Sequence, residues 1–177
     1  WLHALFERLP ALAPSQRDAA ADRWLAQQGL DDAGARRDLI AQALRVIDAP
    51  DFVGLFGPDA LAEAPIAAVV GEAVIAGTVD RLCVGPDVVQ FVDFKTGRVA
   101  PLTLADVPPS HIRQMAAYAA ALAVIFPDRR IEAGLLYTSA PRLITLPAAL
   151  LAAHKPGFVP AQENLPLPPV ERHAPSS

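Results

Sequence analysis

The fold of this chain is decided by residues 77–97, which read GTVDRLCVGPDVVQFVDFKTG. Two runs rich in β-branched and aromatic residues, 73–84 and 88–94, flank Gly85-Pro86-Asp87, and this composition is typical of two strands joined by a tight turn. A third run of the same kind, 64–70, is separated from the first by Gly71-Glu72. Sequential hairpins predict that these three strands are antiparallel.

Beyond this stretch the pattern changes from strand to helix and back. After residues 96–109, apolar side chains recur at helical spacing, and a strand-like run, Ile131–Tyr137, follows them. A helix between two strands predicts a crossover connection. The apolar positions of this helix are Ile112, Met115, Ala119, Leu122 and Ile125. A last strand, Arg142–Leu146, is expected to pair with Ile131–Tyr137 across a short turn.

The N-terminal part has a helical pattern of two or three helices, with one apolar stripe formed by Leu39, Ile40, Ala43, Leu44 and Ile47. We expect Asp18 to cap a helix that runs to Gln28, and Gly29 to terminate it. Residues 49–59, with two prolines and two glycines, are expected to form a connection without a long regular element.

These patterns predict an α/β or α+β fold with a central mixed β-sheet flanked by helices. The 177 residues fit one domain over 1–155, with a mainly helical part at 1–60 and a sheet-containing core at 61–155. Residues 156–177 are rich in proline, and we expect them to be an extended, poorly ordered tail.

Composition excludes several classes of protein. The single cysteine, Cys83, cannot form an internal disulfide or a cluster held by four thiolates, and no apolar run is long enough to cross a bilayer. A soluble, cytoplasmic protein without a membrane partner is therefore expected, and a chain that begins with Trp1 is expected to be a fragment of a longer one. The net charge of -4 argues against tight DNA binding by this chain alone.

Asp80 and Asp93 lie on strands that a tight turn places side by side. Two such carboxylates repel each other unless a cation lies between them, and Mg²⁺ or Mn²⁺ prefers oxygen ligands of this kind. Lys95 shares a face with Asp93, because side chains two apart on a strand point the same way, whereas Val92 and Phe94 face the core. The lysine could orient a water or stabilise charge on a phosphate. Taken alone, Asp93 and Lys95 could equally be a solvated ion pair.

Gln114 and Tyr118 are four residues apart in the expected helix and therefore share one of its faces. From that face they could reach the polar edge of the sheet or a phosphate. An ordinary pair on the helix surface is the alternative.

In this order, Gly-Thr-Val-Asp-Arg-Leu, Asp-Phe-Lys-Thr-Gly and Gln-x-x-x-Tyr resemble the RecB-type branch of the PD-(D/E)xK nucleases, whose core is restriction-endonuclease-like. The resemblance implies metal ligation by the first two aspartates of these motifs, catalysis by the lysine, and support from the glutamine and tyrosine. Those residues are Asp80, Asp93, Lys95, Gln114 and Tyr118.

Two further residues enter through the same resemblance. Glu63 is similar to an acidic residue that precedes the core strands, although an exposed strand-edge carboxylate is as good an interpretation. His3 matches a histidine that the family places on an N-terminal helix as a metal ligand, and a solvent-facing histidine is the alternative. His111, His154 and His173 have no motif support.

Within this branch the chain resembles in particular the C-terminal nuclease domain of AddA-type helicase-nucleases, whereas AddB-type domains carry four cysteines. The resemblance implies an exodeoxyribonuclease with Mg²⁺, or Mn²⁺ in its place, that acts in double-strand break repair and recombination. It also implies upstream helicase domains that alone use ATP and feed a single DNA strand, and an AddB-like partner subunit. A non-catalytic docking or DNA-guiding module and a stand-alone single-strand nuclease are the alternatives.

Overall fold

The computed structural model describes residues 1–97 and 99–156. Its helical elements are α1 (Leu2–Arg8), α2 (Pro14–Gln27), α3 (Ala33–Ile47), the 3₁₀ helices η1 (Pro50–Phe56) and η2 (Leu104–Asp106), α4 (Pro109–Ile125) and α5 (Ala148–Ala153). Its strands are β1 (Ala60–Val70), β2 (Ala73–Val84), β3 (Val88–Lys95), β4 (Arg130–Tyr137) and β5 (Arg142–Leu146).

The five strands form one mixed sheet in the order β1-β2-β3-β4-β5. The first three are sequential antiparallel hairpins, as the turn residues predicted. Strand β4 is parallel to β3, with Lys95 opposite Tyr137, because α4 carries the chain across one face of the sheet. Strand β5 returns antiparallel to β4. The predicted mixed sheet flanked by helices is confirmed.

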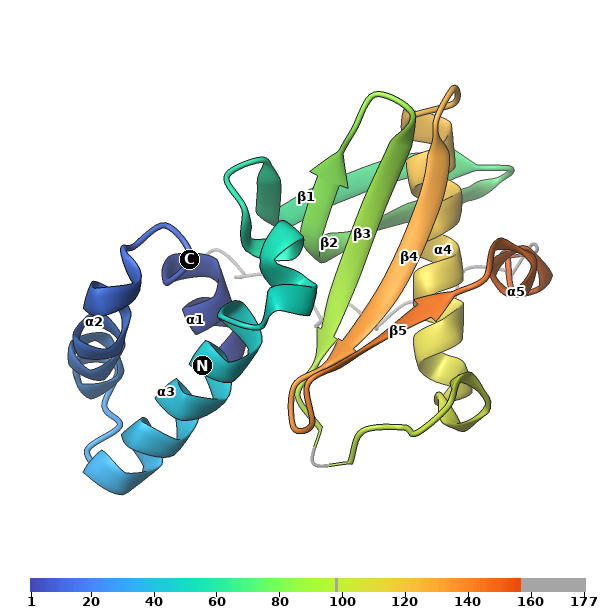
Figure 1. Ribbon diagram of the computed structural model, residues 1–177. Helices are drawn as coiled ribbons and strands as arrows, with labels where there is room; N and C mark the ends of the chain where they lie inside the picture. The colour runs from blue at the N-terminus through green and yellow to red at the C-terminus, as the bar shows by residue number, and fades with distance from the viewer. Residues whose placement is uncertain (98, 157–177) are drawn as a thin grey trace, which may run out of the picture.

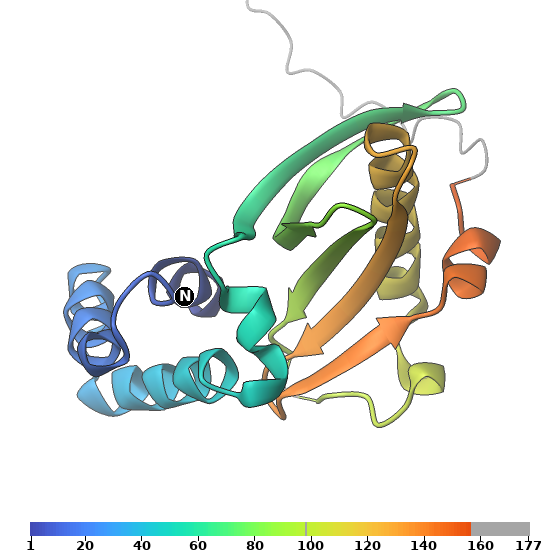
Figure 2. The same cartoon turned by 45° about the horizontal axis from the view of Figure 1, so that its top comes forward.

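The sheet separates two hydrophobic cores. Helix α4 lies along one face, where Met115 and Leu122 pack against strand residues such as Phe91. On the other side, α1, α2, α3 and η1 gather into a helical part whose core receives Val92 and Phe94 from β3 (Figures 1 and 2). Successive residues of β3 therefore bury into different cores, as strand alternation requires.

The start of α2 differs from its sequence-based prediction. The helix begins at Pro14, with Ala13 in the N-cap position, so Asp18 lies inside the helix and does not cap it. Proline is favoured in the first turn because its fixed φ suits the helix and its missing N–H is not needed there. Gly29 has φ 84°, the left-handed conformation expected after the helix end.

The connection at 49–59 is more regular than predicted, because η1 occupies most of it. Pro50 starts this 3₁₀ helix, and the burial of Phe52, Leu55 and Phe56 in the helical part's core stabilises it. The division between the helical part and the sheet lies between Phe56 and Ala60. Apart from Pro156, the predicted proline-rich tail lies outside the described residues. Among the described helices, none has the length and apolar character needed to span a membrane.

Candidate functional site

Strand β2 loses its pairing on both sides at Asp80. The β1–β2 ladder pairs Ala62 with Arg81 and Ala64 with Val79, but skips Glu63 and Asp80. The β2–β3 ladder begins at Arg81 and Val92, so Asp80 is unpaired there too. The backbone N–H of Phe94 instead donates to Oδ2 of Asp80 at 2.5 Å. The Asp80 carboxylate thus accepts a backbone hydrogen bond at the point where the ladder between β2 and β3 would have continued.

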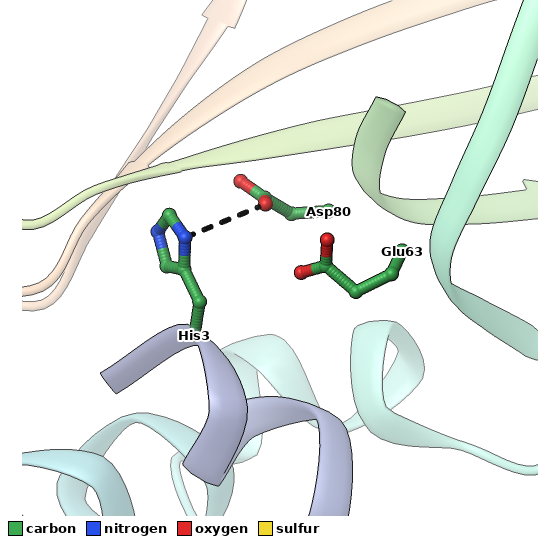
Figure 3. A group of neighbouring side chains, drawn as sticks. All are labelled: His3, Glu63 and Asp80. Atoms are coloured by element: carbon green, nitrogen blue, oxygen red, sulfur yellow. Dashed lines mark ion pairs between the residues drawn. The ribbon is translucent and has the colours of Figure 1, made fainter. Parts of the chain in front are cut away.

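His3, Glu63 and Asp80 come together at this interruption (Figure 3). One ligand atom from each lies within 4.8 Å of the others, and Nδ1 of His3 is 3.8 Å from Oδ1 of Asp80. The three come from α1, β1 and β2, and Figure 3 shows the imidazole and the Glu63 carboxylate directed toward Asp80. A nitrogen and carboxylate oxygens at this spacing form a donor set that suits a divalent metal ion.

Glu63 has a backbone conformation that is uncommon for its residue type. Its φ is 48°, in the left-handed region that residues other than glycine, asparagine and aspartate rarely adopt. Such strain is often found at functional sites, where the surrounding structure maintains it. Here it coincides with the skipped pair in the β1–β2 ladder and presents the side chain beside Asp80.

Asp80 is the buried member of the group, with 9% of its surface exposed. Burial, opposed by the Phe94 hydrogen bond and reinforced by the charges of Asp93 and Glu63, raises its pKa to about 6 from an ordinary 3.8. The charge of Asp93, on the neighbouring strand, is one of the causes of this rise in pKa. A cation bound between the two carboxylates would remove this repulsion.

Asp93, Lys95 and Gln114 form a second group on the α4 side of the sheet. Nζ of Lys95 lies 2.7 Å from Oδ2 of Asp93 and donates to Oε1 of Gln114 at 2.8 Å. Nε2 of Gln114 is 3.5 Å from Oδ1 of Asp93, a long contact. The ammonium is therefore held in a fixed position, and the glutamine ties α4 to the end of β3. Among the described residues, Asp93 lies outside the group of three ligand atoms formed by His3, Glu63 and Asp80.

Tyr118 reaches the sheet one turn further along α4 and lies over Gly77. A Cβ at residue 77 would be 2.4 Å from the tyrosine oxygen, so only glycine leaves room for the ring. Within the described part of the chain, no hydrogen bond joins Tyr118 to Asp80, Asp93 or Lys95. The tyrosine fixes the packing of α4 on β2, whereas Gln114 makes the direct contacts with the site.

Two residues near the site have no signal in the sequence motifs. Nδ1 of His111 is 3.1 Å from the hydroxyl of Tyr137, which lies beside Lys95 on the neighbouring strand. Burial, followed by the charge of Lys95, lowers the pKa of His111, and burial together with the charge of Asp93 raises the pKa of Tyr137. His111 and Tyr137 are 26 positions apart, and the packing of α4 against the sheet brings them together.

Arg81, in the motif but without an assigned role, ties the helical part to the sheet. Its guanidinium donates to the backbone oxygen of Phe6 in α1 and lies 5.0 Å from the centre of the Phe56 ring. Only 4% of its surface is exposed. Because α1 carries His3, this buried contact helps to position the histidine opposite Asp80.

Replacing Asp80 by asparagine is expected to stabilise the metal-free protein at pH 7. In the folded chain the pKa of about 6 exceeds the ordinary 3.8, so between these values the folded state holds more protons than the unfolded state. Stability therefore falls as pH rises from 3.8 to about 6, and then levels off. Asparagine avoids the buried charge, and we expect a gain of about 1–3 kcal/mol at pH 7 that shrinks toward pH 4. Urea unfolding at both pH values measures it, and an equal effect at both would contradict the prediction.

The chain matches the PD-(D/E)XK nuclease superfamily over residues 1–165. It belongs to that superfamily. The mixed five-stranded sheet flanked by helices is consistent with the PD-(D/E)XK fold, and membership indicates a nuclease, a hydrolase of nucleic acids. PD-(D/E)XK nucleases use divalent metals, which agrees with the donor set of His3, Glu63 and Asp80.

Comparison with other proteins adds little to the superfamily assignment. No curated protein matches the chain. A solved structure described as "Crystal structure of SSO0001" is similar over 85% of this chain and 70% of that one, at 16% identity and a TM-score of 0.37. A likeness this distant says nothing about which nucleic acid this PD-(D/E)XK nuclease cuts.

Proposed function

We propose that this domain hydrolyses DNA phosphodiester bonds with a divalent ion held by His3, Glu63 and Asp80 and by Asp93 as a further ligand. The observation that supports the proposal is the interruption of the sheet at Asp80, where His3, Glu63 and Asp80 come together, with Asp93 and Lys95 on the neighbouring strand β3. We propose Mg²⁺ as the ion, with Mn²⁺ as a substitute, because the donors are mainly carboxylate oxygens.

Each residue has a separate task in this proposal. A bound ion supplies Lewis acidity toward the phosphate and favours ionisation of water. Lys95, held by Asp93 and Gln114, places its ammonium where charge develops on the scissile phosphate. The Phe94 N–H fixes one oxygen of Asp80, so its carboxylate is oriented before any ligand binds.

The wider setting that we propose is an AddA-type helicase-nuclease in double-strand break repair. The motif order supports it, and so does the net charge of -4, because a motor elsewhere in the chain could hold the DNA and feed one strand to the site. An exodeoxyribonuclease activity, a cytoplasmic location and an AddB-like partner belong to this proposal. A Gly-x-x-x-x-Gly-Lys-Thr segment upstream in the reading frame would support it.

Two other functions are the alternatives to this one. A non-catalytic docking or DNA-guiding module would not need the Lys95 ammonium fixed beside Asp93 at 2.7 Å. A stand-alone single-strand nuclease would need a basic groove of its own, which the net charge does not favour. Cleavage of end-labelled DNA by the isolated chain would favour the stand-alone enzyme over the fused one.

The metal site makes a direct prediction. Calorimetric titration with Mn²⁺ is expected to show binding that Asp80→Ala removes and that Glu63→Gln weakens about tenfold or more, because each substitution deletes a charged donor. Glu72→Gln, at the exposed tip of the β1–β2 hairpin, is the matched control and should bind as the parent does. Unchanged titration of both site variants would exclude this group as the metal site.

A further inference from the structure

A cavity of about 610 Å³ opens beside Lys95, and its lining includes none of His3, Glu63 and Asp80. It is enclosed by the end of β3, the segment from Val99 to Leu102, the first turn of α4 and the end of β4. Its lining includes Lys95, Pro101, Leu102, Pro108, His111 and Tyr137. Lys95 thus belongs both to the cavity and to the group formed with Asp93 and Gln114.

The wall of the cavity is held in place by hydrogen bonds. Arg142 of β5 donates to the backbone oxygens of Leu102 at 2.7 Å and Pro101 at 3.3 Å. Just beyond, the carboxylate of Asp106 accepts from the backbone and hydroxyl of Thr103, which fixes η2. These contacts hold the cavity in its shape before any ligand enters.

The chemistry of the lining favours a flat, uncharged group with polar edges. Most of the surface is carbon from proline, leucine, valine and alanine side chains, while the His111 imidazole supplies an aromatic face and a polar edge. Tyr137 is buried behind it, with 2% of its surface exposed, and its hydroxyl lies 3.1 Å from Nδ1 of His111, which holds the imidazole in place. Asp106 at the cavity would repel a phosphate placed inside it. A volume of this size is within the range of small-molecule pockets, roughly 300–1,000 Å³.

We propose that this cavity binds one unpaired nucleobase, that of a nucleotide adjoining the scissile phosphate, and this inference rests on the proposed function. A strand with its phosphate at Lys95 extends its neighbouring nucleotide into the cavity, because the lysine borders both. The base stacks on His111, which Tyr137 holds from behind, and meets the apolar wall at Pro101 and Leu102. A base that is paired in a duplex cannot enter, so the cavity selects a single strand.

A cleavage experiment with one abasic nucleotide tests the assignment. The substrate is an oligodeoxynucleotide with a single cleavable phosphate, all others being methylphosphonates, and the base is removed on its 5′ or its 3′ side. We expect the parent protein to cut the substrate that lacks the base on one of these sides about tenfold more slowly, because the stacking of a base on an aromatic side chain typically contributes about this much. His111→Ala, which removes the stacking ring, should slow cleavage of the intact substrate and have little further effect on that abasic substrate. Tyr137→Phe, which removes the hydroxyl bonded to His111, should act in the same direction with a smaller effect. His154→Ala, on a histidine bonded to Leu150 in α5, is the matched control. Equal rates on intact and both abasic substrates would overturn the proposal.

A binding measurement separates this inference from the catalytic one. Titration of the chain with deoxythymidine 5′-monophosphate should shift the NMR signals of the His111 ring saturably, whereas deoxyribose 5-phosphate should not. A chain that binds the nucleotide there but cuts no DNA overturns the proposed function alone. A chain that cuts DNA but shows no base-dependent shift at His111 overturns the cavity assignment alone.

Discussion

Replacing Lys95 by alanine is expected to lower the rate of DNA cleavage by about 100-fold or more, while Mn²⁺ binding is retained. An ammonium cannot coordinate a metal ion, so its loss removes no ligand. Its fixed position, 2.7 Å from Asp93 and bonded to Gln114, suits stabilisation of charge that develops on the phosphate. Groups in such a role typically contribute about 100-fold or more in rate.

The chain offers a close control for this experiment. Lys155, its other lysine, is exposed after α5, and Lys155→Ala removes the same charge away from the site. Single-turnover cleavage of end-labelled DNA and calorimetric titration should be measured on both variants. If the Lys95→Ala protein cuts DNA at close to the parent rate, the lysine has only a structural role, as the partner of Asp93 in an ion pair.

Phe94→Ala is expected to lower the free energy of unfolding by about 3–5 kcal/mol, the usual cost of removing a buried phenylalanine ring. The ring is 4% exposed and packs edge-on against Phe6 at 4.8 Å and in a stack with Phe56 at 5.9 Å. These contacts join the sheet to α1 and η1. We therefore expect weaker Mn²⁺ binding as well, because α1 carries His3.

Phe91→Ala is the matched control for the expected loss of Mn²⁺ affinity. Phe91 is on the same strand and fully buried, but it packs in the core under α4. Its loss should destabilise the fold by a similar amount and leave Mn²⁺ affinity nearly unchanged under conditions where both variants remain folded. Urea unfolding and calorimetry on the pair check this. If both variants lose the same Mn²⁺ affinity, the Phe94 ring affects metal binding only through the overall stability of the fold.

Much of the sheet could be predicted because its signals are local. The turn residues at 85–87 specify a hairpin, and alternation along β3 placed Asp93 and Lys95 on one face and Phe94 in a core. The start of α2 was mispredicted because two capping signals, Pro14 and Asp18, lie within one turn of each other, and the proline determines the boundary.

The grouping of the site residues could not be read from the sequence. Glu63, rather than Asp93, joins His3 and Asp80 in the structure. This arrangement depends on the residue pair that the β1–β2 ladder skips at Asp80 and on the positive φ of Glu63. Neither of these two features has a local signal in the sequence. His111 was set aside because it stands in no motif. It meets its partner Tyr137 only through the packing of α4 against β4, which is not a local feature of the sequence.

Helix α1 is held in place by its packing against the rest of the helical part. Leu5 and Phe6 are buried there, and most helical stability in proteins comes from such packing. In the proposed metal site, His3 would therefore be a ligand only in the fraction of molecules in which α1 is docked, and apparent metal affinity would scale with that fraction. A partner or a force that acts on this helix would change the occupancy of the proposed site without touching the site itself.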